Sequence, residues 1–193
     1  AILAAAMTVF DAKGYEAATV DDIVAASGMS KGAIYGYFKS KREIFLSLLD
    51  WMLERELNYL EKTFSQWDDP WDKLTAYIDV ICDNLAETKP IAWKVDVITQ
   101  AMTDPETREH LQRYLTRYAA AIAPVFAAGA DARLFRLRHE PTTVALIWIM
   151  SLGGIVLYEK ATGQLVSPEV LRAMLKDHLA AFIGYPPATP ESY

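Results

Sequence analysis

The stretch that decides the fold runs from Thr19 to Arg42 and reads TVDDIVAASGMSKGAIYGYFKSKR. Two short helical patterns meet in it at Gly28, and two tyrosines and several cations follow the second pattern. Glycine readily adopts the left-handed conformation that ends a helix. Two short helices joined by such a turn form a helix-turn-helix, whose second helix enters the major groove of DNA.

Capping residues predict where these helices begin. Thr19 with Asp22 three residues later reads as a capping box, and Ser40 with Glu43 repeats the pattern before a third helix. Ser30 is placed to cap the second helix. On the inner faces, Ile34 and Phe38 lie four residues apart and are expected to pack inward, which leaves the other side of the second helix exposed.

The exposed side chains suit a DNA groove. Gly32 and Ala33 are small, so the backbone can approach base edges. Hydrogen-bond donors to phosphate oxygens are available from several side chains around them: Ser30, Lys31, Tyr35, Tyr37 and Lys41. The alternative is a helical hairpin that only packs against the rest of the chain.

The distribution of charge along the chain also favours a DNA contact. The 193-residue chain has a net charge of −6, yet residues 28–42 contain four cations and no acid, and residues 1–47 contain five basic and five acidic residues. A local basic surface on an acidic protein favours a short DNA contact. It disfavours wrapping of nucleic acid over a large surface.

Residues 2–49 resemble the N-terminal DNA-binding domain of the TetR family of bacterial transcriptional regulators. The resemblance lies in AAMTVFDAKGY (residues 5–15), TVDDI (19–23), ASGMSKG (26–32) and IYGYFKSK (34–41). It implies DNA contacts from Thr19, Ser30, Lys31, Gly32, Ala33, Tyr35, Tyr37 and Lys41. The family usually has a short basic arm before its first helix, and no contact is assigned to that arm here.

The remaining pattern is helical almost throughout, and X-Pro pairs mark helix starts because proline is tolerated in a first turn. We predict an all-α fold with about nine helices, near 1–13, 20–27, 31–38, 40–66, 70–88, 90–102, 105–129, 141–161 and 168–183. Pro124 should kink the seventh. Residues 1–47 would form the three-helix DNA-binding domain (helix-turn-helix about 19–38), 48–185 a helical ligand-binding and dimerisation domain, and 186–193 a loose C-terminal tail.

The last two helices are the expected dimer surface, because two apolar helices from each of two subunits can form a four-helix interface. A two-fold dimer would read a palindromic operator. The expected interface residues are Leu146, Met150, Leu157, Leu171, Leu175, Leu179 and Phe182. Alternatively, the helix near 141–161 belongs to the core of one subunit.

A pocket for a small, largely apolar ligand is expected among the middle helices, where aromatic residues gather. Its candidate lining is Trp67, Trp71, Tyr77, Trp93, Val97, Met102, Tyr114, Tyr118 and Trp148. The alternative is that these residues are core. Asp79, Asp83 and Asp96 lie near the same faces, where they would either be solvated or pair with a cationic ligand.

The chain has no pattern typical of an enzyme. No nucleophile–base set, metal-ligand spacing or glycine-rich phosphate loop is present, so we expect neither catalysis nor a cofactor nor a bound metal. The single Cys82 fits a reducing cytosol. Residues 142–158 carry no charge, but two glycines interrupt them, and a buried helix is the favoured interpretation over a membrane span.

These observations predict a cytoplasmic, homodimeric repressor of the TetR type that a small molecule releases from its operator. An activator would use the same residues. The alternative from another class is a helical small-molecule binding or interaction module whose helix-turn-helix does not function.

Overall fold

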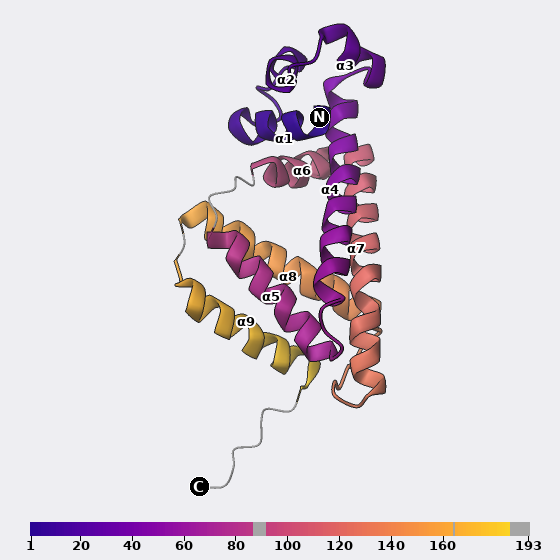
Figure 1. The fold of residues 1–193 in the computed structure, drawn as a ribbon, viewed down its shortest axis with the longest axis vertical. Coiled ribbons are helices and arrows are strands. Elements are labelled where there is room, and N and C mark those ends of the chain that lie inside the picture. The colour runs from indigo at the N-terminus through magenta and orange to yellow at the C-terminus, as the bar shows by residue number, and fades with distance from the viewer. Residues whose placement is uncertain (87–91, 164, 186–193) are drawn as a thin grey trace, which may run out of the picture. The chain divides into compact units, whose positions relative to one another are not determined.

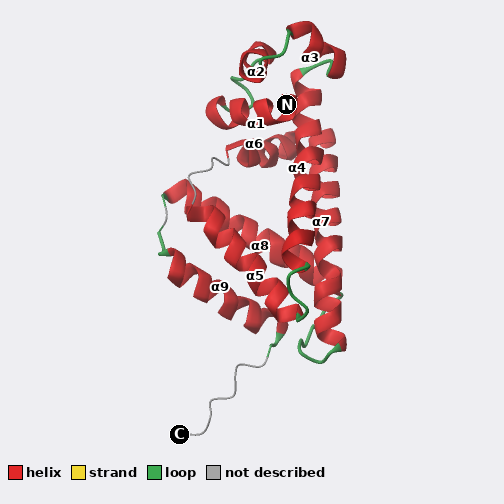
Figure 2. Cartoon of the chain, viewed as in Figure 1, coloured by secondary structure: helices red, strands yellow, loops and turns green. Residues whose placement is uncertain are grey.

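The computed structural model describes residues 1–86, 92–163 and 165–185. Within these ranges all regular structure is helical and no strand is present (Figures 1 and 2). The described helices are α1 (Ile2–Lys13), α2 (Val20–Ser27), α3 (Lys31–Tyr37), α4 (Lys41–Phe64), α5 (Pro70–Ala86), α6 (Ala92–Thr103), α7 (Pro105–Asp131), α8 (Pro141–Thr162) and α9 (Pro168–Ile183). The predicted all-α fold is confirmed.

Helix boundaries follow the residues that predict them. Pro70, Pro105, Pro141 and Pro168 are each the first residue of a helix, where the missing N–H has no intrahelical partner to lose. α7 continues through Pro124 to Asp131. The predicted helix start at Pro90 and the predicted loose tail at 186–193 lie outside the described residues.

The chain divides into two compact units. The first contains the described residues of 1–56 and 90–115, and the second those of 57–89 and 116–193. α6 and the beginning of α7 therefore belong to the same unit as the helix-turn-helix. The boundary that the sequence predicts at residue 47 follows the motif and does not include these two later segments.

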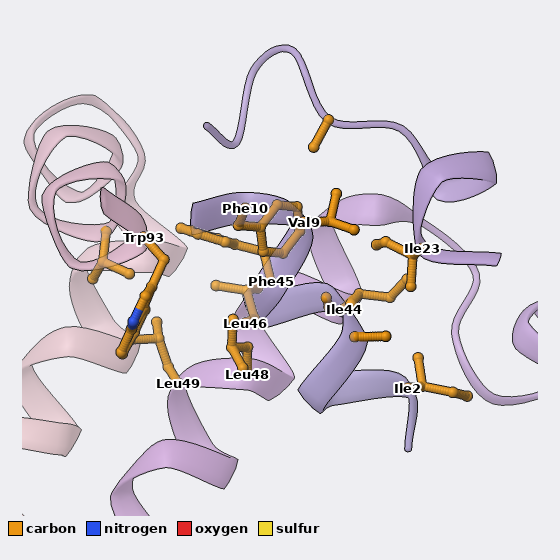
Figure 3. Packing of buried hydrophobic residues seen from close by; sticks show 14 of the residues in the cluster. Ile2, Val9, Phe10, Ile23, Ile44, Phe45, Leu46, Leu48, Leu49 and Trp93 are labelled. Atoms are coloured by element: carbon orange, nitrogen blue, oxygen red, sulfur yellow. The ribbon is translucent and has the colours of Figure 1, made fainter. Parts of the chain in front are cut away.

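The core of the first unit joins α1, α2, α3, α4 and α6. Phe10 of α1 meets Phe45 of α4 edge to face, with 5.6 Å between ring centroids, and Ile23 of α2 and Trp93 of α6 belong to the same cluster (Figure 3). Ile34 of α3 is fully buried there, as its spacing predicts. This packing holds the helix-turn-helix on a folded base.

The core of the second unit is formed by α5, the later part of α7, α8 and α9. α5 packs against both α8 and α9. Trp148 of α8 and Phe126 of α7 are buried and lie edge to face at 5.5 Å. Of the described helices, α8 alone is long and apolar enough to cross a bilayer. This is weak evidence for a membrane span, because core helices also reach this length and hydropathy.

Candidate nucleic-acid interface

The start of α2 is held by the predicted capping box. The Thr19 hydroxyl accepts from the Asp22 N–H at 3.1 Å, and the Asp22 carboxylate accepts from the Thr19 N–H at 3.0 Å. Asp22 also pairs with Lys13 of α1 at 2.6 Å. The Lys13 ammonium and the Thr19 donors hold the pKa of Asp22 at about 2. The cap therefore fixes α2 against α1 as well.

The turn between α2 and α3 has the geometry that its residues predict. Gly28 adopts φ 68° and ψ 9°, a left-handed conformation that L side chains rarely adopt, and ends α2. Ser30 then caps α3 by accepting from the Ala33 N–H at 3.1 Å. The two helices thus form a helix-turn-helix.

One face of α3 is open to solvent. Lys31, Gly32, Tyr35 and Tyr37 are all exposed, and the Tyr37 side chain retains 71% of its accessible area. No atom lies within 4 Å of the position that a side chain at Gly32 would occupy. Thr19 and Ser30 are also exposed, and Ala33 is half-buried. The candidate contact residues of α2 and α3 therefore lie at an accessible surface of small and hydroxyl-bearing groups.

Lys31 places a positive charge at the start of α3, and this charge forms an ion pair within the chain. Its ammonium lies 2.7 Å from the carboxylate of Asp21 on α2, and this contact raises the pKa of Lys31. The sequence predicted Lys31 as a phosphate donor without identifying this partner.

Lys41, the first residue of α4, has three protein partners. Its ammonium donates to the carbonyl oxygens of Tyr15, Glu16 and Ala18 at 2.6, 3.1 and 3.0 Å. A lysine ammonium has three N–H donors, so this set uses all of them. The predicted DNA contact from Lys41 would require it to give up at least one carbonyl.

The start of α4 departs from the predicted cap in one detail. Ser40 accepts from the Glu43 N–H at 3.1 Å, as expected. The Glu43 carboxylate, however, accepts from the N–H of Lys39 at 2.7 Å and not from that of Ser40. The carboxylate thus satisfies a donor one residue before the expected one.

Arg42 is also engaged within the first unit. Its guanidinium pairs with Asp104 at 2.8 Å and with Glu106 at 2.7 Å, at the junction of α6 and α7. Bonds from Thr107, and next the pairing with Arg42, hold the pKa of Asp104 at about 2. Among the cations of residues 28–42, three of the four therefore have charged or carbonyl partners in the described part of the chain.

α6 contacts the connection between α1 and α2 through two polar side chains. Asp96 accepts from the Tyr15 N–H at 2.7 Å, and Gln100 donates to Glu16 at 2.7 Å. Asp96 therefore accepts a hydrogen bond from the backbone at Tyr15. No local sequence signal identifies these contacts, because the partners are more than eighty residues apart.

The predicted pocket residues fall into both units. In the first unit, Trp93 and Val97 are buried in the core around α1 and α4, Met102 is 72% exposed, and Tyr114 donates to Glu56. These four are not gathered around one space. Trp93 and Val97 pack α6 onto the core that supports the helix-turn-helix.

In the second unit, three of the predicted pocket residues come together. The hydroxyls of Tyr77 and Tyr118 lie 2.5 Å apart, and the Tyr77 ring lies 5.6 Å from that of Trp148. All three are buried. Trp71 instead stacks on Tyr185 at 4.1 Å, and Trp67 is 45% exposed.

Asp79 and Asp83 have partners on α9. Arg172 donates to Asp79 at 3.1 Å and to Asp83 at 2.7 Å, and Lys176 pairs with Asp79 at 2.8 Å. These ion pairs join α5 to α9, so the two carboxylates already have cations within the chain.

The predicted dimer residues differ in accessibility. Met150 and Phe182 are exposed, whereas Leu175 and Leu179 are buried in the second unit's own core, which corrects their assignment to a partner surface. Leu146, Leu157 and Leu171 are half-buried. Large apolar side chains that are exposed on α8 and α9 are Ile147, Met150, Tyr158, Val170, Met174 and Phe182.

Two hollows among the described residues each lie within a single unit. The first, of about 280 Å³, is lined by residues of α4 and α7 and by Ser40, and the second, of about 880 Å³, lies along the connection before α8 and along α8 and α9. Neither hollow is lined by the predicted pocket residues. Among the described residues, no group of three His, Cys, Asp or Glu side chains could hold a metal ion.

Comparisons with known proteins agree with this geometry. Residues 2–48 match the model for bacterial regulatory proteins of the tetR family, and residues 70–184 match that for the C-terminal domain of BetI-type transcriptional repressors. The HTH-type transcriptional regulator YfiR of Bacillus subtilis is 27% identical over 157 residues, which cover 80% of this chain and 76% of YfiR. CymR of Pseudomonas putida is 27% identical over 116 residues, 60% of this chain and 57% of CymR.

Solved structures share the fold. A TetR transcriptional regulator from Chloroflexus aurantiacus superposes with a TM-score of 0.77 at 21% identity, covering 93% of this chain and 92% of that one. Reduced NemR of Escherichia coli gives a TM-score of 0.78 at 16% identity, covering 91% and 93%. The exposed recognition-type helix, the all-helical architecture and both family matches lead to one conclusion: this chain belongs to the TetR family of transcriptional regulators.

Proposed function

We propose that this regulator is a cytoplasmic homodimeric repressor that binds a palindromic DNA operator through α2 and α3. The observation that carries the proposal is the open face of α3, where Tyr35 and Tyr37 are exposed beside small residues on a folded base. Tyrosine hydroxyls and the N–H groups of the capped helix starts at Thr19 and Ser30 are donors to phosphate oxygens.

Exposed apolar side chains support the dimer. On α8, Ile147, Met150 and Tyr158 retain about half or more of their accessible area, and on α9 Met174 retains 60%. Apolar stripes of this kind are typical of surfaces that bind another chain. In our proposal α8 and α9 pair with the same helices of a second copy, which places two copies of α3 on successive turns of DNA.

Aromatic packing in the second unit supports a small-molecule effector. Tyr77, Tyr118 and Trp148 form a buried aromatic cluster whose two hydroxyls bond to each other, and in our proposal an uncharged, largely apolar ligand binds by opening this cluster. A ligand that binds one conformation of the dimer more tightly would shift the population away from the DNA-binding one. The match to BetI-type repressors favours repression over activation.

The role of Tyr37 tests the proposal. Tyr37→Phe removes one exposed hydroxyl. We therefore expect binding to a duplex enriched from random DNA to weaken by about five- to tenfold, as for the loss of one hydrogen bond. The free energy of unfolding should not change. Tyr59→Phe, at a tyrosine that is 50% exposed in the second unit, is the matched control. Equal affinities of the two variants, measured by fluorescence anisotropy, would reject the assigned interface.

A further inference from the structure

The ammonium group of Lys41 lies inside a ring of backbone carbonyls. Its three hydrogen bonds, of 2.6 to 3.1 Å, go to Tyr15, Glu16 and Ala18, and its nitrogen lies 4.5 Å from the centroid of the Tyr15 ring. Lys41 is half-buried. Each N–H of the ammonium therefore has an oxygen acceptor, and the charge lies against an aromatic face.

The three carbonyls belong to the connection between α1 and α2. α1 ends at Lys13, Gly14 has φ 76°, and the Ala18 N–H donates to the Gly14 carbonyl at 3.2 Å. This tight turn directs the three carbonyl oxygens toward one cation. Without that cation the part-buried carbonyls of Tyr15 and Ala18 would lack this hydrogen-bond donor, which is unfavourable.

The placement of Lys41 along the chain gives this contact a role. Ala18 immediately precedes Thr19, the cap of α2, and Lys41 follows the end of α3 by four residues. The ammonium thus links Ala18, just before the helix-turn-helix, to Lys41, just after it. One side chain therefore holds both ends of the helix-turn-helix together.

The turn that Lys41 grips is itself fixed. Asp96 accepts from the Tyr15 N–H at 2.7 Å, and the Tyr15 ring lies 4.3 Å from the Phe45 ring. A cation anchored on a rigid turn is poorly placed to follow a phosphate, because moving it breaks three charge-assisted hydrogen bonds.

We propose that Lys41 is a positioning residue, which closes the helix-turn-helix so that α2 and α3 meet DNA in register, and that it is not a phosphate ligand. The inference rests on the proposed DNA-binding function. It reassigns a residue for which the family resemblance implies direct contact with DNA.

Two variants separate the two roles. Lys41→Met keeps the length of the side chain but removes every donor. Lys41→Arg keeps the charge and would bind a phosphate at least as well, but its planar guanidinium cannot direct three N–H groups at three converging carbonyls. Lys39→Met is the matched control, since Lys39 is an exposed lysine two residues earlier and loses the same charge.

Hydrogen exchange of the free chain tests, without DNA, whether the Lys41 ammonium fixes the turn between α1 and α2. The informative amides are those of Tyr15, Ala18 and Asp22, which donate to Asp96, Gly14 and Thr19. We expect Lys41→Met and Lys41→Arg to accelerate their exchange about tenfold, as local opening becomes easier. Lys39→Met should leave these rates unchanged.

Binding to the enriched duplex tests the role of Lys41 in DNA recognition. It is measured at a temperature where circular dichroism shows every variant folded. Positioning predicts that both Lys41 variants weaken binding by about tenfold, the effect of ~1.4 kcal/mol, with the slope of log Kobs against log salt little changed. A phosphate contact instead predicts that Lys41→Arg binds like wild type and that Lys41→Met lowers the slope by about 0.9 per protomer.

The inference would be overturned if Lys41→Arg bound like wild type, Lys41→Met lowered the salt slope and both variants left the exchange rates unchanged. So would faster exchange with unaltered DNA binding, since Lys41 would then support stability alone. A wild-type chain that binds no DNA would overturn the proposed function, and the inference with it. The exchange rates would still report whether Lys41 anchors the turn, which distinguishes the two failures.

Discussion

The ammonium of Lys31, at the start of α3, lies 2.7 Å from the carboxylate of Asp21 in the first turn of α2. Both side chains are exposed, so the pair contributes little to stability. Its consequence concerns DNA, because a cation that already has an anion partner releases fewer counterions when it meets a phosphate. Asp21 therefore opposes the DNA contact that Lys31 can make.

Asp21→Asn should tighten DNA binding and steepen its salt dependence by about 0.9 per protomer, the slope expected for one further neutralised phosphate. The measurement is the affinity for the enriched duplex across a salt series. In a double-mutant cycle with Lys31→Met, the gain should disappear if Asp21 acts through Lys31. Weaker binding of Asp21→Asn to one sequence alone would instead identify Asp21 as an acceptor from a cytosine amino group.

Gly32→Ala separates stability from DNA affinity. The new methyl group enters open space, and alanine favours a helix over glycine by about 0.5–1 kcal/mol, so α3 should be stabilised. Binding should nevertheless weaken, because the methyl group occupies the gap between backbone and base edges. Unchanged binding by Gly32→Ala, measured by anisotropy, would show that this backbone does not approach DNA closely.

Met150→Glu tests the pairing of α8 and α9. Met150 is 51% exposed, so a carboxylate there is tolerated in the monomer but buried in the proposed dimer. We expect sedimentation equilibrium to give a dimer for wild type and a monomer for the variant. Met102→Glu places the same charge at a 72% exposed methionine of the first unit and should remain dimeric. A dimer that survives Met150→Glu would place the interface elsewhere.

Acid should weaken the first unit through Asp22 and Asp104. The folded pKa of each carboxyl is about 2, below the 3.8 of an unperturbed aspartate. A lowered folded pKa means that the ionised group stabilises the fold above pH 3.8 and loses this contribution as pH falls toward 2. Urea unfolding across this range should therefore show a shallower loss of stability in Asp104→Asn than in wild type. Parallel curves would contradict the lowered pKa of Asp104 and its assigned bonds from Thr107 and Arg42.

The helices could be predicted because their signals are local. Thr19, Gly28 and Ser30 bond or turn within four residues of their own positions, so the sequence contains all that decides the helix-turn-helix. The prolines at helix starts act in the same way. α2, α3, α5, α7, α8 and α9 accordingly begin at their predicted first residues.

The faces of the helices could not be predicted as well. α8 is apolar nearly all round, so its period does not distinguish the side that carries Trp148 from the side that carries Met150. Trp93 has the same difficulty, since an aromatic residue at helical spacing does not reveal which helices surround it. The carbonyl partners of Lys41 could not be predicted for a further reason: the directions of three loop carbonyls depend on tertiary structure.

Selection of bound sequences from a pool of random duplex DNA at moderate salt is the most direct test of DNA recognition by α2 and α3. We expect an enriched palindrome whose two half-sites lie one or more helical turns apart, at ~34–36 Å per turn. We also expect Tyr37→Phe to retain the same sequence less efficiently. A folded dimer that enriches no sequence would contradict DNA recognition and favour a helical ligand-binding module.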